Sequence, residues 1–333
     1  MVMNLKDYQN VWIFAQVQHG KLSPTAYELL TAGRKLADAL NEKLCAVLLG
    51  YNVKQVAQDL MEHGADIVYV CDEPALENYL DDTYAHVLAE MVAQYKPNKF
   101  LIPATNMGRA LSAKTAVFVG TGLTADATDV TINQADGQLH ATRPTFGGNL
   151  MATITCAKTR PEMCSLRPMA YEKAPAQPGR RGEIVDVKID VQKYVTPLAK
   201  FVQFIQSKEG GLDLSEAEVI VAGGRGVGSK DGFKLLEKLA TRLGGAVGAS
   251  RGPVDSGWID YRYQIGLTGR TVKPKLYIAC GISGQIQHMA GMSGAGVIVA
   301  INKDPNAPMM KAAHFALEGD LHEVVPAMLE ALH

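Results

Sequence analysis

Apolar residues in the second half of the chain come in four short runs, and each run is followed by a glycine-rich turn or by polar residues. The runs cover residues 218–222, 245–249, 276–280 and 296–301, and a segment with helical spacing, residues 231–243, follows the first. Short runs that are apolar throughout and alternate with helices are typical of a parallel sheet covered on both faces. Ligands bind such sheets at the carboxyl ends of the strands. The pattern therefore predicts a nucleotide- or dinucleotide-binding domain.

The first half of the chain shows a similar alternation. The expected strands cover residues 11–15, 44–49, 66–71 and 99–102, and the expected helices cover residues 26–40, 53–63, 82–95 and 106–119. This order predicts a second parallel sheet. The turns of this half lack the glycine density that close approach to a phosphate needs, so we expect a scaffold or a surface for a partner.

The alternation changes between residues 122 and 164. Asp126, Thr128 and Asp129 mark a turn, and residues 142–149 join two short strands. Two segments, residues 151–156 and 162–167, are expected as antiparallel strands added to the sheet. Residues 183–191 are expected as the last strand of this domain.

Two adjacent glycines, Gly210 and Gly211, mark the expected domain boundary. The fold class is therefore α/β with two domains. Residues 1–207 form a parallel-sheet domain of the nucleotide-hydrolase-like type. Residues 208–333 form a Rossmann-like domain.

Composition narrows the class of protein. Of the 333 residues, 47% are hydrophobic and 20% are charged, which is ordinary for a globular protein, and the net charge of -1 gives no support to nucleic-acid binding. The five cysteines are odd in number and show no zinc or iron–sulfur spacing. The sequence shows no signal peptide and no apolar run of membrane-spanning length. We expect a cytoplasmic protein without a metal site or membrane insertion.

The first glycine-rich turn invites comparison with NAD-binding proteins. Residues 224–228 read GxGxG, whereas the dinucleotide fingerprint reads GxGxxG. An NAD site also needs an acidic residue at the end of the second strand for the ribose hydroxyls. Ser250 and Arg251 stand there instead. The pattern argues against a nicotinamide-dependent oxidoreductase, which remains the alternative from another class.

Polar residues at the strand ends suit a pyrophosphate and a sugar-like chain. They are Arg225, Ser250, Arg251, Ser283 and Asn302. A helix expected to open near Gln285 adds amide donors that favour an anion. Asp320 has the position of a helix N-cap, with Glu323 three residues later, and can serve as cap, as ribose ligand or as both. His288 has no nucleophile pattern beside it, and a structural donor is its commoner role.

Three arginines, Arg143, Arg160 and Arg167, each precede a proline. Proline holds the preceding residue in an extended conformation, so each arginine is presented on a restricted backbone. One interpretation is a set of edge strands that end at proline. The other is a cationic rim for a phosphate or for acidic groups of a partner.

Five of the second-half motifs resemble, in order, the α subunit of electron transfer flavoproteins. They are residues 224–226 (Gly-Arg-Gly), 248–251 (Gly-Ala-Ser-Arg), 264–269 (Gln-Ile-Gly-Leu-Thr-Gly), 283–288 (Ser-Gly-Gln-Ile-Gln-His) and 300–305 (Ala-Ile-Asn-Lys-Asp-Pro). The resemblance covers residues 218–332 strongly and the first domain more weakly. It implies a heterodimer with a β subunit, in which the C-terminal domain of this chain binds one FAD.

The resemblance also implies which residues contact that FAD. They are Arg225, Ser250, Arg251, Gln264, Ile265, Gly266, Leu267, Thr268, Gly281, Ser283, Gly284, Gln285, Ile286, Gln287, His288, Asn302, Asp320 and Leu321. Thr268 is expected to bond flavin N5, Arg251 to lie over the isoalloxazine, and His288 to approach O2. Donors and positive charge at these atoms stabilise an anionic reduced flavin. Leu267 replaces a frequent glutamine of the family, so that glutamine's side-chain contacts are not expected here.

A narrower resemblance concerns residues 122–126, 142–149 and 160–163, which are similar to flavin-bifurcating electron transfer flavoproteins of anaerobes. It implies a β subunit that holds a second FAD, where other members hold AMP, and accepts hydride from NADH. One electron then goes to ferredoxin or flavodoxin and the other, through the first FAD, to an acyl-CoA dehydrogenase. One of the three proline-preceding arginines would reach the second flavin. The alternative is a non-bifurcating shuttle from acyl-CoA dehydrogenases to a quinone reductase.

Overall fold

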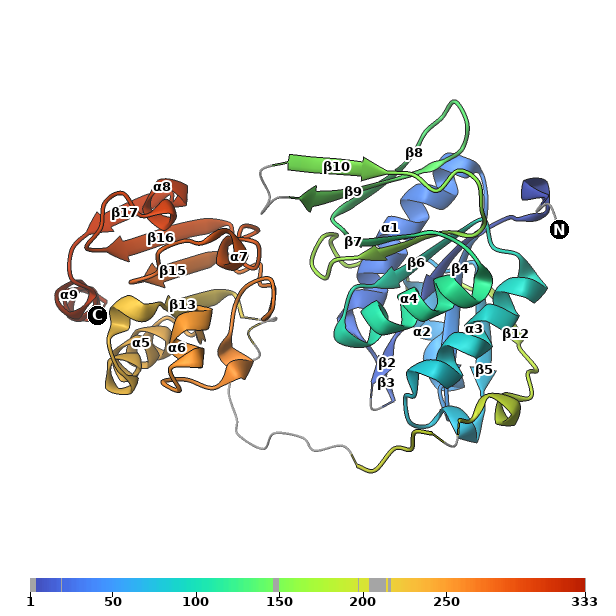
Figure 1. Ribbon diagram of the computed structural model, residues 1–333, viewed down its shortest axis with the longest axis horizontal. Helices are drawn as coiled ribbons and strands as arrows, with labels where there is room; N and C mark the ends of the chain where they lie inside the picture. The colour runs from blue at the N-terminus through green and yellow to red at the C-terminus, as the bar shows by residue number, and fades with distance from the viewer. Residues whose placement is uncertain are drawn as a thin grey trace. The chain divides into compact units, whose positions relative to one another are not determined.

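The computed structural model of the 333-residue chain describes residues 4–18, 20–145, 150–196, 198–203, 214 and 217–332. The chain forms two compact units, Met1–Phe204 and Ile205–His333. The boundary expected after residue 207 and the pair Gly210 and Gly211 lie outside the described residues. Each unit is an α/β fold built on its own parallel sheet (Figure 1).

The sheet of the first unit has seven strands in the order β12-β5-β4-β1-β6-β11-β7, all of them parallel. The strands are β1 (Val11–Phe14), β4 (Leu44–Gly50), β5 (Ile67–Asp72), β6 (Lys99–Pro103), β7 (Leu123–Ala127), β11 (Glu162–Leu166) and β12 (Glu183–Asp186). A small hairpin, β2 (Val17–Gln18) with β3 (Lys21–Leu22), follows β1. The central strands are buried at every position, as parallel strands between two helical layers must be.

Four helices cover the two faces of this sheet. They are α1 (Pro24–Leu40), α2 (Ala57–Glu62), α3 (Asp81–Tyr95) and α4 (Asn106–Val119). Side chains alternate along β1, so that Val11 and Ile13 pack with α1 and α2, while Trp12 and Phe14 pack with α3 and α4. The two hydrophobic cores of the unit therefore lie on opposite faces of one sheet (Figure 1).

Two of the strands expected between residues 122 and 167 are placed differently from the prediction. The strands β8 (Asp129–Ile132), β9 (Leu139–Thr145) and β10 (Leu150–Ile154) form a separate antiparallel sheet. The prediction of antiparallel pairing for residues 162–167 was wrong, because β11 lies between β6 and β7 and is parallel to both. The arginines and prolines that flank β11 are typical of an edge strand. Glu162 is nevertheless buried against Lys99 and Arg160.

The sheet of the second unit has five parallel strands in the order β14-β13-β15-β16-β17. The strands are β13 (Val219–Gly223), β14 (Ala246–Ala249), β15 (Leu276–Cys280), β16 (Val297–Asn302) and β17 (Phe315–Glu318). The helices are α5 (Lys230–Arg242), α6 (Arg251–Asp255), α7 (Ile286–Met289), α8 (Pro308–Ala312) and α9 (Leu321–Ala331). Helices α5 and α9 pack on one face, and α8 packs on the other (Figure 1).

The strand order of this sheet contains one reversal. The chain leaves β13 for β14 on one side and returns to β15 on the other side. Connections that depart in opposite directions open a crevice at the carboxyl ends of the two strands. The functional site is therefore expected above β13 and β15.

Candidate functional site

The carboxyl edge of the second sheet gathers residues that are far apart in the sequence. In strand order, Ser250 follows β14, Arg225 follows β13, Gly281 follows β15, Asn302 ends β16 and Asp320 lies just beyond β17. Because the strands are parallel, their carboxyl ends lie along the same edge. The residues predicted from the strand ends thus form one row.

The turns after β13 and β15 touch in the middle of this row. The amide of Gly226 donates to the carbonyl of Gly281 at 3.1 Å, and the amide of Gly224 donates to the carbonyl of Cys280 at 2.9 Å. A Cβ on Gly224 would lie 2.2 Å from the oxygen of Gly281, so only glycine allows this approach. The chain then enters α5, whose N-cap Ser229 accepts from the amide of Gly232 at 3.2 Å.

Two exposed arginines flank the crevice. The aliphatic part of Arg225 packs on Gly252, where a Cβ would lie 2.6 Å from Cγ of the arginine. Nε of Arg251 lies 3.1 Å from a carboxylate oxygen of Asp255. Ser250 occupies the N-cap of α6, and its side chain makes no capping hydrogen bond. Two cations and a hydroxyl at the switch point suit an anionic ligand such as a pyrophosphate.

The loop of residues 264–268 is attached to the segment that follows β15. Nε2 of Gln264 donates to Oγ1 of Thr268 at 3.0 Å, and the amide of Leu267 donates to the carbonyl of Gln287 at 2.7 Å. Gly266 has φ +145°, a conformation that residues with a Cβ rarely adopt. The structure therefore brings the Gln264–Thr268 motif and the Ser283–His288 motif together.

Within the Ser283–His288 motif, the side chains of Ser283, Gln285, Ile286 and Gln287 are exposed. Gln285 is the N-cap of α7, as expected, although α7 has only four residues. Gly284 has φ +84° and lies so close to Met309 that a Cβ would be 2.3 Å from its amide nitrogen. The motif is therefore a tight turn that presents polar side chains at the edge.

His288 differs from its neighbours because it points inward. Nδ1 lies 3.0 Å from the carbonyl oxygen of Ile265, and Nε2 lies 3.0 Å from the hydroxyl of Tyr277. Burial lowers the pKa of His288 to about 4, although the hydrogen bond to Ile265 opposes the shift. The imidazole is neutral at physiological pH, and its geometry matches the structural-donor interpretation.

At the end of the row formed by β16 and β17, side chains form hydrogen bonds with the backbone of the turns. Nδ2 of Asn302 donates to the carbonyl of Ile282 at 2.9 Å. Asp320 caps α9 by accepting from the amide of His322 at 2.9 Å, and Lys303 lies 2.8 Å from its carboxylate. The hydrogen bond from Lys303 holds the pKa of Asp320 below its usual range. The predicted capping role of Asp320 is confirmed, and its ribose contact stays a prediction.

Four predicted contact residues have buried side chains: Gln264, Ile265, His288 and Leu321 are 3%, 1%, 6% and 4% exposed. Sequence reasoning missed Tyr277 and Lys303, which bond to His288 and Asp320. Tyr277 belongs to an apolar strand, where a tyrosine is indistinguishable from an ordinary core residue. Lys303 belongs to the motif of residues 300–305, but its ion pair with Asp320 depends on β17, a strand that the hydrophobic pattern does not predict.

The three proline-preceding arginines lie in the first unit and have different surroundings. Arg160 is buried, and its guanidinium lies 2.7 Å from Glu162 and 3.0 Å from Oδ1 of Asn98. Arg167 makes two hydrogen bonds to the carboxylate of Asp126, at 2.7 and 3.2 Å. Arg143 lies within β9, and its Nε has no hydrogen-bond partner in the described part of the chain.

Two further expectations concern metals and membranes. Within the described ranges, the structure contains no group of three or more His, Cys, Asp or Glu residues placed to hold a metal ion. The helices of the same ranges include none that combines the length and apolar character of a membrane span.

Comparison with known proteins gives two family matches. The electron transfer flavoprotein domain matches residues 11–192, and the electron transfer flavoprotein FAD-binding domain matches residues 213–293. The chain is 47% identical to an electron transfer flavoprotein subunit alpha of Thermoanaerobacterium thermosaccharolyticum, over 98% of this chain and 99% of the relative. It is 48% identical to protein FixB of Clostridium saccharobutylicum, over 98% and 97% of the two chains.

A third relative has a more specific name. The chain is 40% identical to the acryloyl-CoA reductase electron transfer subunit beta of Anaerotignum propionicum, over 99% of this chain and 97% of the relative. Each of these relatives is matched along nearly its whole length.

Proposed function

Because this chain belongs to the electron transfer flavoprotein family as an alpha subunit, we propose that it binds one FAD along the carboxyl edge of its second sheet and passes single electrons through it. The observation that supports this most strongly is the row of Arg225, Ser250, Gly281, Asn302 and Asp320 at that edge. The row includes cations and glycine turns for a pyrophosphate, and it ends at a carboxylate suited to a sugar hydroxyl.

In this proposal each part of the edge has a role in holding the cofactor. Arg225, Ser250 and the amides near Gly281 bind the pyrophosphate and ribityl chain. Arg251 and Thr268 approach the isoalloxazine, where a cation and a hydroxyl favour the anionic reduced flavin. Bound FAD supplies the one-electron chemistry, and these residues orient it and tune its potential.

The alternative of a nicotinamide-dependent oxidoreductase has less support. The site offers Ser250 and Arg251 where NAD binding needs a carboxylate. Arg251 is exposed and paired with Asp255, a residue of its own helix. Asp255 lies within α6 and not at the end of β14, where the ribose of NAD would be bound.

We propose further that the chain acts as a heterodimer with a β subunit in the cytoplasm, and that the pair is of the bifurcating type. The narrower sequence resemblance supports this proposal, and so do relatives from anaerobes such as Clostridium acetobutylicum and Megasphaera elsdenii. An acyl-CoA dehydrogenase is the proposed acceptor, consistent with the relative named for acryloyl-CoA reductase.

Among the three arginines, Arg143 is our candidate for reaching the second flavin. The guanidinium of Arg160 is bound to Glu162, and that of Arg167 is bound to Asp126. Arg143 is only partly buried, and within the described residues no acidic side chain pairs with its guanidinium, although its Nε is itself buried. Replacing Arg143 with alanine should therefore weaken binding of the second FAD and leave binding of the first FAD unchanged.

An anaerobic NADH titration of the purified heterodimer tests the bifurcating proposal. We expect two FAD per heterodimer and direct bleaching of the visible spectrum by NADH. One FAD that ignores NADH but is reduced by an acyl-CoA dehydrogenase would instead establish the shuttle to a quinone reductase. Stoichiometric NAD binding without flavin would favour the nicotinamide alternative.

A further inference from the structure

A buried chain of hydrogen bonds crosses the second unit from β15 to the loop of residues 264–268. The carbonyl of Ile265 can only accept, so Nδ1 of His288 must bear the proton and donate across 3.0 Å. The second nitrogen of a neutral imidazole accepts, so the hydroxyl of Tyr277 donates to Nε2 across 3.0 Å. For a neutral imidazole, the two contacts therefore define one tautomer of His288.

The surroundings of Tyr277 keep it in the role of donor. Its side chain is fully buried on β15, and burial raises the pKa of the phenol well above its ordinary value. Cys280, the titratable group next to it, is also uncharged, because burial raises the pKa of its thiol to about 12. In the part of the chain that the structure describes, His288 is the hydrogen-bond partner of this hydroxyl.

The series of hydrogen bonds from Tyr277 through His288 ends at Ile265, in the candidate cofactor loop of residues 264–268. Ile265 directly precedes Gly266, Leu267 and Thr268, and the amide of Leu267 is bonded to Gln287, the neighbour of His288. Gly291 packs against Gly266 so closely that a Cβ would lie 2.4 Å from its amide nitrogen. A rotation of the imidazole would therefore break the hydrogen bond that holds the backbone of Ile265 next to this loop.

We propose that Tyr277 is a positioning residue: its hydroxyl fixes His288 as the neutral Nδ1-protonated imidazole, which in turn holds the loop of residues 264–268 in place for the cofactor. The effect of Tyr277 on the tautomer of His288 depends on the protein alone. The effect on cofactor binding rests on the proposed function, because the cofactor is the FAD of that proposal.

The first test reads the tautomer directly. In heterodimer labelled with ¹⁵N-histidine, long-range ¹H–¹⁵N spectra distinguish the two ring nitrogens, and His288→Gln identifies the signals of His288. We expect the Nδ1-protonated pattern throughout pH 5.5–8 in the wild type. Tyr277→Phe removes the donor to Nε2 and destabilises the neutral form, so the pKa of His288 should rise. A wild-type imidazole that is protonated at Nε2, or an unchanged His288 spectrum in Tyr277→Phe, overturns the proposal.

Tyr84 provides a matched control in the first unit. Its hydroxyl is also buried and donates to the carbonyl of Leu76 at 2.7 Å. Tyr84→Phe therefore removes a comparable buried hydrogen bond, and it should leave the signals of His288 unchanged. A shift of His288 in this variant would mean that the effect of Tyr277→Phe reflects general destabilisation.

The second test concerns the cofactor. Loss of one buried hydrogen bond behind the loop should weaken FAD binding on the order of fivefold in Tyr277→Phe, measured as Kd by flavin fluorescence. Tyr84→Phe should retain the wild-type affinity. Equal FAD affinity in Tyr277→Phe and the wild type would overturn the link to the loop. A wild-type heterodimer without flavin would refute the proposed function, while the NMR spectra would still decide the tautomer.

Discussion

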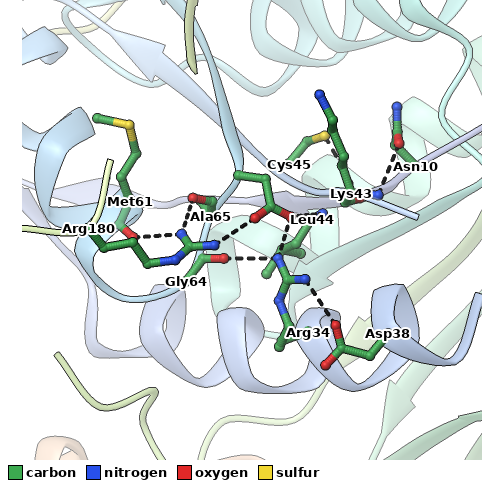
Figure 2. Close-up of polar contacts among 11 residues, drawn as sticks. Asn10, Arg34, Asp38, Lys43, Leu44, Cys45, Met61, Gly64, Ala65 and Arg180 are labelled. Carbon is green, nitrogen blue, oxygen red and sulfur yellow. Dashed lines mark hydrogen bonds and ion pairs between the residues drawn. The ribbon is translucent and has the colours of Figure 1, made fainter. Parts of the chain in front are cut away.

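At the scale of single residues, Asp66 joins two arginines from distant parts of the first unit. Arg34 of α1 and Arg180 both donate to its carboxylate, and the amide of Leu44 donates to it at 2.8 Å. Figure 2 shows the two guanidinium groups converging between α1 and the segment of Met61, Gly64 and Ala65. Burial raises the pKa of Asp66, but these hydrogen bonds outweigh it and hold the pKa below its usual range.

Asp66→Asn tests this junction. A carboxylate whose pKa is lowered in the folded state stabilises the protein above the pKa of the unfolded state, near 4. That stability is lost as the pH falls through the lower folded value. We expect Asp66→Asn to lower the free energy of unfolding by about 1–3 kcal/mol at pH 7, measured by urea unfolding.

The difference between Asp66→Asn and the wild type should shrink below about pH 4, because the wild-type carboxyl then becomes neutral too. Asp136→Asn is a suitable control, since Asp136 is an exposed loop residue of the same unit. A difference that stays constant down to pH 3 would contradict an ionic origin.

At the scale of elements, β11 shows how burial of charge fixes a strand. Lys99 and Glu162 are 0% and 1% exposed, and Nζ of Lys99 lies 3.2 Å from the carboxylate. Nζ also donates to the carbonyl of Gly137 at 2.8 Å. The group thus joins β6 and β11 to the antiparallel sheet. Burial lowers the pKa of Lys99, while Glu162 favours its charged form.

Glu162→Gln should destabilise the first unit strongly. It leaves the charges of Lys99 and Arg160 without their buried counterion, a change that costs about 3–5 kcal/mol. The control is Glu183→Gln, because Glu183 is exposed on the edge strand β12. Chemical unfolding of both variants measures the effect. Equal stability of the two would show that the buried group does not hold β11.

The turn after β15 allows a second comparison between elements. Gly281 has φ +61°, and a Cβ there would lie 2.8 Å from Cα of Gly226. Gly244 has φ +64°, with nothing within 4 Å of such a Cβ. Alanine in a left-handed conformation costs roughly 1–2 kcal/mol at either site. Gly281→Ala should lower the thermal midpoint clearly more than Gly244→Ala, and equal shifts would argue against close contact of the two turns.

The strands that the hydrophobic pattern predicts correctly share one physical property. β1, β4 and β15 lie inside their sheets and are buried on both faces, so their sequences are apolar. β17 was missed because its apolar run, Phe315–Leu317, is too short to stand out as a strand. The pairing of β11 was predicted wrongly because its buried Glu162 pairs with Lys99 of β6, a residue distant in sequence that no local pattern reveals.

At the scale of the whole molecule, the two α/β units have different roles in the function that we propose. The first presents Arg143 and a sheet of its own, and the second gathers the candidate cofactor residues at one edge. The sequence predicts that edge because ligand residues follow apolar strands. It does not predict the inward orientation of His288, which depends on Tyr277 and on the fold of the intervening loop.

The flavin content of the purified heterodimer tests the central claim most directly. Arg225→Glu reverses an exposed charge at the switch point, and Lys238→Glu makes the same change on the exposed surface of α5. If the FAD pyrophosphate lies at the edge of the second sheet, Arg225→Glu should lose one FAD per heterodimer and Lys238→Glu should keep it. A heterodimer that retains all its FAD with Arg225→Glu would contradict the site proposed here.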